Sequence, residues 1–362
     1  MRIFHVDPSI NKAKTIHTDF YTSEDVFSAV KEKIFAKSMQ FIGDMDLLPE
    51  RSYAHPFQML PELVDEPLFI SRDNNDKVRC LSNVCTHRGN LLITKPGKLK
   101  KISCGYHGRM FSDDGKMTFM PEFDDVDDFP CANDHLTNLP VFKWGKLLFT
   151  SLNKNTDPSI FFSDMMKRMS FFPMDKLQRR EDLSKDYYIE TNWALYCENY
   201  LEGFHIPFVH EELNKAVDFS NYTTELFFPY SSLQLGLAKE TDLVFDLPKD
   251  SPDYGSPVAA YYFWVYPNLM FNFYPWGLSL NIVQPLSVDK TKVSFITYIL
   301  DESKYDQGAG GGLDKVELED EKIVEQVQKG VKSRFYSQGR YSTKREKGTH
   351  HFHTILANAI NK

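Results

Sequence analysis

Two short segments of the chain each place a cysteine close to a histidine. The first is Cys85-x-His87 in NVCTHRGN, and the second is Cys104-x2-His107 in SCGYHGRMF. Glycines lie next to both pairs, so each pair is expected at a tight turn between strands. Two such turns would present two ligands each to one metal centre.

Two kinds of metal centre use two cysteines and two histidines. A tetrahedral zinc ion accepts this donor set, although zinc ligands usually lie two to four residues apart in each half, so Cys-x-His is unusual. The alternative is a [2Fe–2S] cluster in which one iron binds two thiolates and the other two imidazoles, which raises the reduction potential. The spacing favours the iron–sulfur cluster and leaves zinc open.

A second group of candidate metal ligands lies about a hundred residues further along. The segment ENYLEGFHIPFVH, residues 198–210, contains Glu202, His205 and His210. Glu202 and His205 are three residues apart and would share a helix face. His205 and His210 would point about 140° apart on a straight helix. Both can reach one metal only if the helix is interrupted, and Pro207 predicts that interruption.

A third ligand is expected from the acidic segment DKVELEDEKIVEQVQKG, residues 314–330. Its helical periodicity produces an apolar stripe of Val316, Ile323, Val324, Val327 and Val331. Asp320 lies on this stripe, whereas three acids point more outward: Glu319, Glu321 and Glu325. A buried carboxylate needs a partner, and a metal ion would be one. Asp320 is therefore the preferred ligand, with Glu317 as the second candidate.

These motifs together resemble a known family. CTHRG followed by CGYHG is similar to the paired cluster-binding sequences of Rieske proteins. Over nearly its whole length the chain resembles the Rieske non-haem iron oxygenases, the α subunits of aromatic-ring-hydroxylating dioxygenases, which include choline and carnitine monooxygenases. The resemblance implies a [2Fe–2S] cluster and one mononuclear Fe(II), the latter with open positions for dioxygen. The implied cluster ligands are Cys85, His87, Cys104 and His107, and the implied iron ligands are His205, His210 and Asp320.

The resemblance also implies a role for Glu202 and a set of partners. In this family an acid at this position bridges a histidine of the iron site and a histidine of the cluster across a subunit interface, which implies a homotrimer. Electrons from NAD(P)H would arrive through a separate reductase or ferredoxin, because the chain has no Rossmann glycine fingerprint and no second four-cysteine set. Glutamate instead of the commoner aspartate resembles members that act on quaternary ammonium compounds. Arg109 departs from the tryptophan common in the family.

The segments between the motifs predict an α+β protein. Ser23 is the expected N-cap of a helix over residues 23–37, whereas short apolar runs separated by Pro, Gly, Asn and Asp indicate many short strands up to about residue 150. Apolar runs in residues 257–300 indicate a large antiparallel sheet. Three parts are expected: an N-terminal helical segment packed on the catalytic domain (1–39), a small all-β Rieske domain (40–152) and a helix-grip catalytic domain (153–362).

Aromatic residues of this sheet are expected to line a substrate pocket. The candidates are Tyr261, Phe263, Tyr266, Phe271, Phe273 and Trp276. Strand alternation sends every second side chain to one side, so for each residue ordinary core packing is the competing expectation. An aromatic pocket can hold an arene by stacking or a trimethylammonium group by cation–π attraction. The sequence leaves this choice open, and with it the choice between monooxygenation and dihydroxylation.

Composition excludes several other classes. The chain has 362 residues and a net charge of −8, which argues against a nucleic-acid or anionic-membrane partner. The sequence contains no run of eighteen apolar residues, so it predicts no membrane-spanning helix. Five cysteines without an apolar leader segment indicate thiols and metal ligands in a cytoplasmic protein. Cys80, Cys131 and Cys197 are expected to be buried thiols.

Two other functions remain open from the sequence alone. One is a Rieske ferredoxin-like electron carrier, which is disfavoured because about two hundred residues follow the cluster segment. The other is a zinc-stabilised binding module without a redox role.

Overall fold

The computed structural model describes residues 2–210, 222–238 and 243–362. The chain divides into two compact units, one formed by Met1–Phe35 with Asp157–Lys362 and the other by Ala36–Thr156. In the described ranges, no helix is long and apolar enough to cross a membrane.

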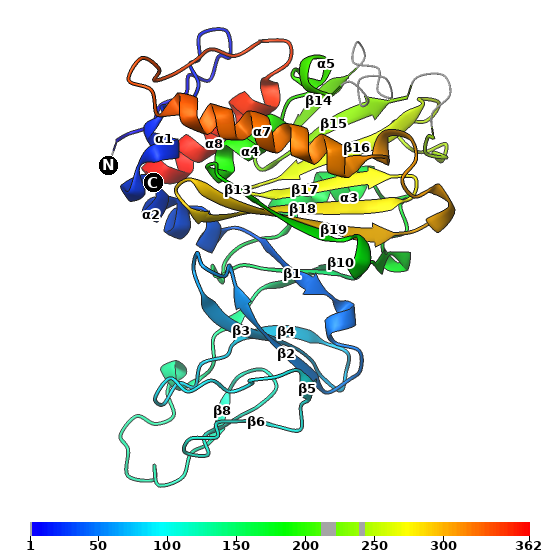
Figure 1. Cartoon of the computed structure of the whole chain (residues 1–362). Coiled ribbons are helices and arrows are strands. Elements are labelled where there is room, and N and C mark those ends of the chain that lie inside the picture. The colour runs from blue at the N-terminus through cyan, green and yellow to red at the C-terminus, as the bar shows by residue number, and fades with distance from the viewer. Residues whose placement is uncertain (1, 211–221, 239–242) are drawn as a thin grey trace. The chain divides into compact units, whose positions relative to one another are not determined.

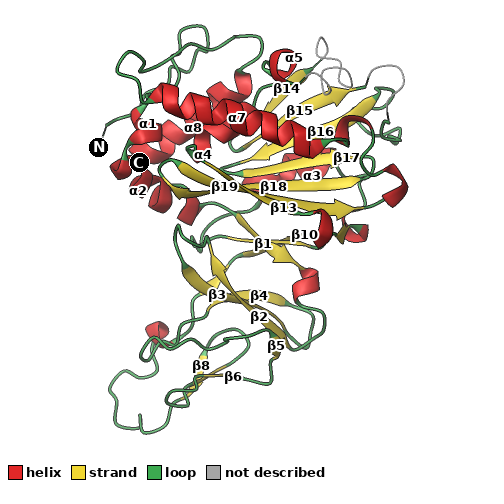
Figure 2. Ribbon diagram, in the orientation of Figure 1, coloured by secondary structure: helices red, strands yellow, loops and turns green. Residues whose placement is uncertain are grey.

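The smaller unit consists of three antiparallel sheets (Figures 1 and 2). Its strands are short because Gly, Pro, Asn and Asp interrupt them repeatedly. The first sheet contains β1 (Gln40–Asp44), β11 (Leu147–Thr150) and β10 (Val141–Trp144), in this order. The second contains β5 (Gly97–Lys98), β2 (Tyr53–Met59), β3 (Glu66–Arg72), β4 (Val78–Ser82) and β9 (Asn138–Leu139). The third contains β6 (Ile102–Ser103), β7 (Met110–Phe111) and β8 (Met117–Phe119).

The larger unit is built on one antiparallel sheet, as the apolar runs predicted. Its order is β12 (Gln178–Arg179), β19 (Lys290–Ile299), β18 (Gly277–Ser287), β17 (Leu269–Tyr274), β16 (Val258–Val265), β15 (Ser231–Leu237) and β14 (Thr223–Phe227). A further strand, β13 (Lys185–Ile189), also pairs with β19.

Helices cover both faces of this sheet (Figure 1). They are α1 (Asp19–Thr22), α2 (Glu24–Lys33), α3 (Ser159–Arg168), α4 (Trp193–Tyr200), α5 (Ile206–Val209), α7 (Leu313–Val331) and α8 (Lys347–Asn361). The Ser23 hydroxyl accepts the Val26 N–H and caps α2, which confirms the predicted N-cap. Helix α4 packs on α7 and on β18, whereas α3 packs on β15 and β16.

Short 3-10 turns connect these elements. They occupy Phe35–Lys37, Met45–Leu47, Ala132–Asp134, Met174–Lys176, Glu181–Leu183, Glu302–Lys304 and Gly308–Gly310.

On one face of the large sheet, aromatic side chains form a hydrophobic core. Phe271 and Phe273 are fully buried and pack edge-on against Phe162 of α3 and Phe172 just after it, with ring centroids 6.4 and 5.1 Å apart. Phe263 lies on the same face, opposite Phe271 in the strand register. The strand pattern therefore places these aromatic side chains in the hydrophobic core under α3.

The buried thiols were predicted correctly at two of three positions. Cys80 in β4 and Cys197 in α4 are fully buried. Cys131 is exposed, so the prediction was wrong there. Cys131 precedes a 3-10 turn, where its backbone N–H is bound by the Asp134 carboxylate at 2.8 Å. Cys131 therefore belongs to a surface turn and not to the core.

Candidate metal centres

The two Cys/His segments form loops with the same backbone pattern. The Gly89 N–H donates to the Cys85 carbonyl at 3.0 Å, and the Gly108 N–H donates to the Cys104 carbonyl at 3.1 Å. Both glycines have left-handed φ angles, +74° and +75°, which other residues adopt only with strain. The glycines therefore close each loop around its cysteine.

The predicted ligands converge at these loops. Cys85 and Cys104 are buried within the hydrophobic core of the small unit, and the rings of His87 and His107 lie 4.8 Å apart. His107 Nδ1 is buried and has no hydrogen-bond partner in the described part of the chain, although such atoms are normally paired. Two thiols, two imidazoles and one unpartnered ring nitrogen fit a histidine-ligated [2Fe–2S] cluster.

Hydrogen-bond donors surround the second thiol. The Tyr106 N–H and the Asn90 side-chain amide point at Cys104 Sγ, at 3.4 and 3.7 Å. Burial raises the pKa of the Cys104 thiol, but the Tyr106 N–H, the Cys85 thiol, the His107 N–H and the Asn90 amide together outweigh burial and lower the pKa. The pKa of the Cys85 thiol is raised instead, chiefly by burial. The second loop thus favours the Cys104 thiolate, which is the form that binds metal.

Arg109 has a clear structural role in place of the tryptophan of related proteins. It is only 2% exposed. Its guanidinium donates to Thr86 Oγ1 at 2.7 Å and to Asp134 Oδ1 at 3.0 Å, and lies 5.8 and 5.2 Å from the ring centres of Phe123 and Phe129. Thr86 sits between two predicted ligands of the first loop, so Arg109 ties the second loop to the first.

Replacing Arg109 with methionine is expected to loosen both loops. Because one partner of a buried ion pair is removed, unfolding of the small unit should become easier by about 3 kcal/mol. The measurements are the melting temperature, the acid-labile sulfide per chain and the iron per chain. All three should fall. Arg88→Met is the matched control, because Arg88 is exposed and also adjoins a predicted ligand. Equal cluster content in the two variants would contradict this role.

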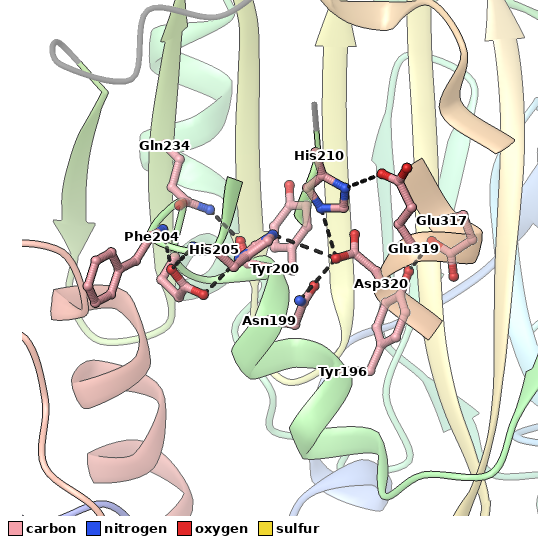
Figure 3. A network of polar contacts seen from close by, with 11 residues as sticks. Tyr196, Asn199, Tyr200, Phe204, His205, His210, Gln234, Glu317, Glu319 and Asp320 are labelled. Atoms are coloured by element: carbon pink, nitrogen blue, oxygen red, sulfur yellow. Dashed lines mark hydrogen bonds and ion pairs between the residues drawn. The ribbon is translucent and has the colours of Figure 1, made fainter. Parts of the chain in front are cut away.

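A second set of donors converges in the larger unit. One ligand atom each from His205, His210 and Asp320 lies within 4.8 Å of the others. Asp320 Oδ1 is 3.0 Å from His210 Nε2 and 3.6 Å from His205 Nε2 (Figure 3). Asn199 of α4 donates its side-chain N–H to the same oxygen at 3.0 Å. Two imidazoles and one carboxylate fit the facial triad that binds non-haem Fe(II).

Each histidine of this triad is oriented by a second carboxylate. His205 Nδ1 lies 2.7 Å from Glu202 Oε1, and His210 Nδ1 lies 2.8 Å from Glu319 Oε2 (Figure 3). A carboxylate at Nδ1 favours the Nδ1–H tautomer, which leaves the Nε2 lone pair free for a metal. Burial lowers the pKa of His210, but Asp320 and Glu319 outweigh it and raise the pKa.

The backbone around the histidines differs in detail from the prediction. Helix α4 ends at Tyr200, and the chain turns before α5 begins at Ile206. Glu202 and His205 therefore share a turn and no helix face. Glu202 Oε2 also accepts the backbone N–H groups of Phe204 and His205. Pro207 is in the first turn of α5, where a missing N–H costs least, so the interruption lies before the proline.

Glu319 was missed as a site residue by sequence reasoning. Helical periodicity places it on the outer side of α7, and it is partly exposed, yet its side chain curls back to His210. Glu317, the alternative ligand, is only 3% exposed and accepts a hydrogen bond from the Tyr196 hydroxyl at 2.6 Å. Glu317 is not part of the converging triad.

Replacing Glu319 with alanine is expected to weaken iron binding by roughly 10- to 100-fold, because His210 loses the group that fixes its tautomer. The measurement is iron affinity by competition with a chelator under anaerobic conditions. Glu325→Ala is the control, since Glu325 also lies on α7 but binds the Glu190 N–H. An unchanged affinity in Glu319→Ala would remove Glu319 from the site.

A cavity lies beside the triad, between the second face of the sheet and helices α4 and α7. Five tyrosines line it, among them Tyr200, Tyr222, Tyr262 and Tyr274. The rings of Tyr262 and Tyr274 meet edge-on, 6.0 Å apart. Burial raises the pKa of Tyr200, Tyr222 and Tyr274, so these hydroxyls are neutral at ordinary pH. The other lining side chains used below are Tyr196, Glu202, Gln234, Asn272, Ser279, Asn281, Phe295 and Glu317.

The aromatic residues expected in the pocket are placed elsewhere. Phe263, Phe271 and Phe273 lie on the α3 face, and Tyr261 opposite Phe273 does too. Trp276 is fully buried in the turn after β17, stacked on Tyr274 at 5.1 Å, and Tyr266 stacks on Tyr230 at 5.0 Å. None of these six is among the described residues that line the cavity. The lining comes from the alternate positions of the same strands.

Polar side chains cross the cavity face of the sheet in register. Gln234 is opposite Tyr262, Tyr262 is opposite Asn272, Asn272 is opposite Ser279, and Ser279 is opposite Thr297. We call this set the polar row. Directly opposed residues share one face of a sheet. The site therefore combines a metal triad, aromatic walls and a hydrogen-bonding floor.

Comparison with known proteins matches both units. Residues 174–362 match the family model of the ring hydroxylating α subunit (catalytic domain), and residues 47–130 match that of the Rieske [2Fe–2S] domain. Choline monooxygenase of Arabidopsis thaliana is 30% identical over 374 residues, covering 97% of this chain and 84% of the relative. The carnitine monooxygenase oxygenase subunit of Escherichia coli K12 is 27% identical over 363 residues, covering 96% and 94%.

Solved structures agree with this match. A quaternary ammonium Rieske monooxygenase, studied for carnitine oxidation by gut microbiota and inter-subunit electron transfer, has a TM-score of 0.73 at 25% identity, covering 96% of this chain and 95% of that one. Naphthalene 1,2-dioxygenase from Rhodococcus sp. shares the fold, with a TM-score of 0.68 at 16% identity and coverage of 96% and 94%.

The fold and the site define a Rieske non-haem iron oxygenase, and the chain belongs to the ring hydroxylating α-subunit family. It is the oxygenase component of a Rieske-type system, with a [2Fe–2S] cluster in one domain and a mononuclear iron in the other. The α+β fold class is confirmed. The electron-carrier and zinc-module alternatives are not favoured, because the catalytic-domain match covers more than half of the chain.

Proposed function

We propose that the protein monooxygenates a small quaternary ammonium compound. The observation that carries this proposal is the tyrosine-lined cavity beside the metal triad. A quaternary nitrogen has no N–H to donate, so proteins recognise it through aromatic faces. The names of the choline and carnitine relatives point to the same class of substrate.

The charge of the cavity supports a cationic substrate. Glu317 lines the cavity, and burial raises the pKa of its carboxyl well above the usual range, although the Tyr196 hydroxyl opposes the shift. Without a bound cation this shift favours the neutral acid, whereas a bound quaternary ammonium group would favour the carboxylate and be attracted to it.

We propose the following metal ligands on the basis of the converging donors. The cluster is held by Cys85, His87, Cys104 and His107, and the iron by His205, His210 and Asp320. When bound, the iron supplies the position at which dioxygen is reduced and a substrate C–H bond is oxidised. The tyrosines hold the cationic group beside this position and keep bulk water from it.

We propose Glu202 as the bridge that connects the iron site to a cluster histidine of a neighbouring subunit, in a homotrimer. Its Oε1 already binds His205. Exposed aromatic side chains next to it support a protein contact: Phe208 is 81% exposed, and its ring packs on Phe204. Tyr106 is likewise exposed beside a cluster loop. Exposed apolar side chains clustered in this way favour an interface.

A separate reductase or ferredoxin, itself supplied by NAD(P)H, is the proposed electron donor. We also propose a cytoplasmic location. Cys80 and Cys197 are buried free thiols, which favours a reducing compartment.

The test is a substrate screen with purified, iron-loaded protein and a reductase from a related system. Choline, carnitine, γ-butyrobetaine and naphthalene are compared by product analysis and dioxygen uptake. Oxidation of a quaternary amine but not of naphthalene is expected. Tyr262→Leu should raise the KM about tenfold through loss of cation–π attraction, whereas Tyr262→Phe should not. Oxidation of naphthalene alone would overturn the proposal.

A further inference from the structure

Asn281 of β18 is an unusual residue in the cavity wall. It is 5% exposed and lines the cavity. Its Oδ1 accepts the Ser279 hydroxyl at 2.8 Å. In the described part of the chain, its side-chain N–H groups donate to no residue. A buried amide is normally paired on both sides, so these N–H groups are available to a ligand in the cavity.

The neighbouring amides differ in this respect. Asn272 donates to the Ser279 carbonyl at 3.2 Å and accepts the Tyr200 hydroxyl at 2.8 Å. The Gln234 amide donates to the Tyr200 carbonyl. These contacts hold the polar row in place, and the Ser279 hydroxyl fixes the Asn281 amide from one side. The Asn281 amide is thus held in position by Ser279, while its side-chain N–H groups remain available as donors.

The register shows what surrounds this donor. Asn281 is opposite Met270 on one side and Phe295 on the other, and Phe295 also lines the cavity. The free N–H groups therefore lie beside an aromatic wall, with no protein acceptor supplied by the strands next to them. A substrate oxygen is the natural acceptor.

The ionisable groups of the cavity restrict the kind of oxygen. Besides the tyrosines, those among the described lining residues are Glu202, Glu317, Asp320, His205 and His210. No lysine or arginine occurs among the described residues that line the cavity. Among the described lining residues, a substrate carboxylate would meet three acidic side chains and no side-chain ammonium or guanidinium partner, which is unfavourable in a buried site. An uncharged hydroxyl meets neither difficulty.

We propose that Asn281 binds a hydroxyl oxygen of the substrate, so that the preferred substrate is a quaternary ammonium alcohol. This inference rests on the proposed function and narrows it. A site built to hydrogen-bond a substrate hydroxyl discriminates against the analogue that lacks it, because the buried donor is then left unpaired. Asn281 would determine specificity at the end of the substrate away from its quaternary nitrogen.

The experiment removes the Asn281 amide and the substrate hydroxyl, singly and together, and compares the four binding affinities. Wild-type protein and the isosteric variant Asn281→Leu, both loaded with cluster and iron, are compared for dissociation constants by calorimetry. The probes are choline, ethyltrimethylammonium, which lacks only the hydroxyl, and γ-butyrobetaine, which carries a carboxylate. Wild type should bind choline at least about tenfold more tightly than ethyltrimethylammonium. In Asn281→Leu this ratio should approach about one, with ethyltrimethylammonium affinity nearly unchanged.

Met270→Leu is the matched control, because Met270 is opposite Asn281 but is not among the described lining residues. It should keep the wild-type ratio. An unchanged ratio in Asn281→Leu, or tighter wild-type binding of γ-butyrobetaine than of choline, would overturn the inference while leaving the proposed function intact. Failure of every quaternary amine to bind wild type would overturn both.

Discussion

Replacement of Asp320 by alanine is expected to remove the mononuclear iron and all substrate oxidation while leaving the cluster intact. Asp320 Oδ1 lies within 3.6 Å of both histidine Nε2 atoms, so the variant lacks one of three ligands. The two remaining imidazoles have no charge to offset a divalent cation, and iron is lost to solvent. The protein should then hold roughly two irons per chain in place of roughly three.

The measurement combines iron and acid-labile sulfide analysis with the visible spectrum. Sulfide and the visible bands should be unchanged, because the cluster belongs to the other unit. Glu317→Gln is the matched control on the same helix. Glu317 is also a buried acid, but it binds Tyr196 and not the histidines, so its variant should keep the third iron. Loss of that iron in Glu317→Gln with retention in Asp320→Ala would exchange the two assignments.

His210→Ala gives an independent check of the same site. Its ring is 1% exposed and contacts Asp320 and Glu319, so the variant should lose the same single iron and retain the visible colour. Full substrate oxidation by His210→Ala would exclude this histidine from the iron site.

The proposed ligands of the two metal centres stand out in the sequence because their spacing is local. Cys85 and His87 sit in one loop, and Cys104 and His107 in another, so each pair is visible within a few residues. The helical period favoured Asp320, and the position of the carboxylate in the family that the chain resembles supported the same choice. The same period predicted that Glu319 points outward. Its long, flexible side chain instead bends back, so that its carboxylate contacts His210.

The cavity was not predictable in the same way. The central strands are buried on both faces, so β17 (Leu269–Tyr274) shows no polar–apolar alternation that marks the site. The period of two separates Phe271 and Phe273 from Asn272 and Tyr274, but it does not say which set faces the iron. Only the packing of α3 on one side, and of α4 with α7 packed on it on the other, decides this. The small polar signal at Asn272 was the available hint.

Replacement of Glu202 by glutamine is expected to stop electrons from reaching the iron while both metal centres stay loaded. A carboxylate offers two acceptor oxygens and can bind two imidazole N–H groups at once, whereas a glutamine amide offers one. His205 Nδ1 binds Oε1, and the backbone N–H groups of Phe204 and His205 bind Oε2, so both oxygens are in use before a second imidazole is added. Substrate oxidation driven by reductase should therefore fall about 100-fold, at the upper end of what loss of such a carboxylate costs.

Two rate measurements on this variant distinguish slower electron transfer from damage to the iron site. Re-oxidation of the pre-reduced cluster by dioxygen with substrate present should slow by a similar factor, about 100-fold. Oxidation driven by hydrogen peroxide needs no cluster electron, so it should persist if the iron remains in place. Glu202→Asp keeps both acceptor oxygens on a shorter stem and should retain part of the rate. If Glu202→Gln re-oxidised its cluster at the wild-type rate, or lost peroxide-driven turnover to the same extent, Glu202 would serve only to orient His205.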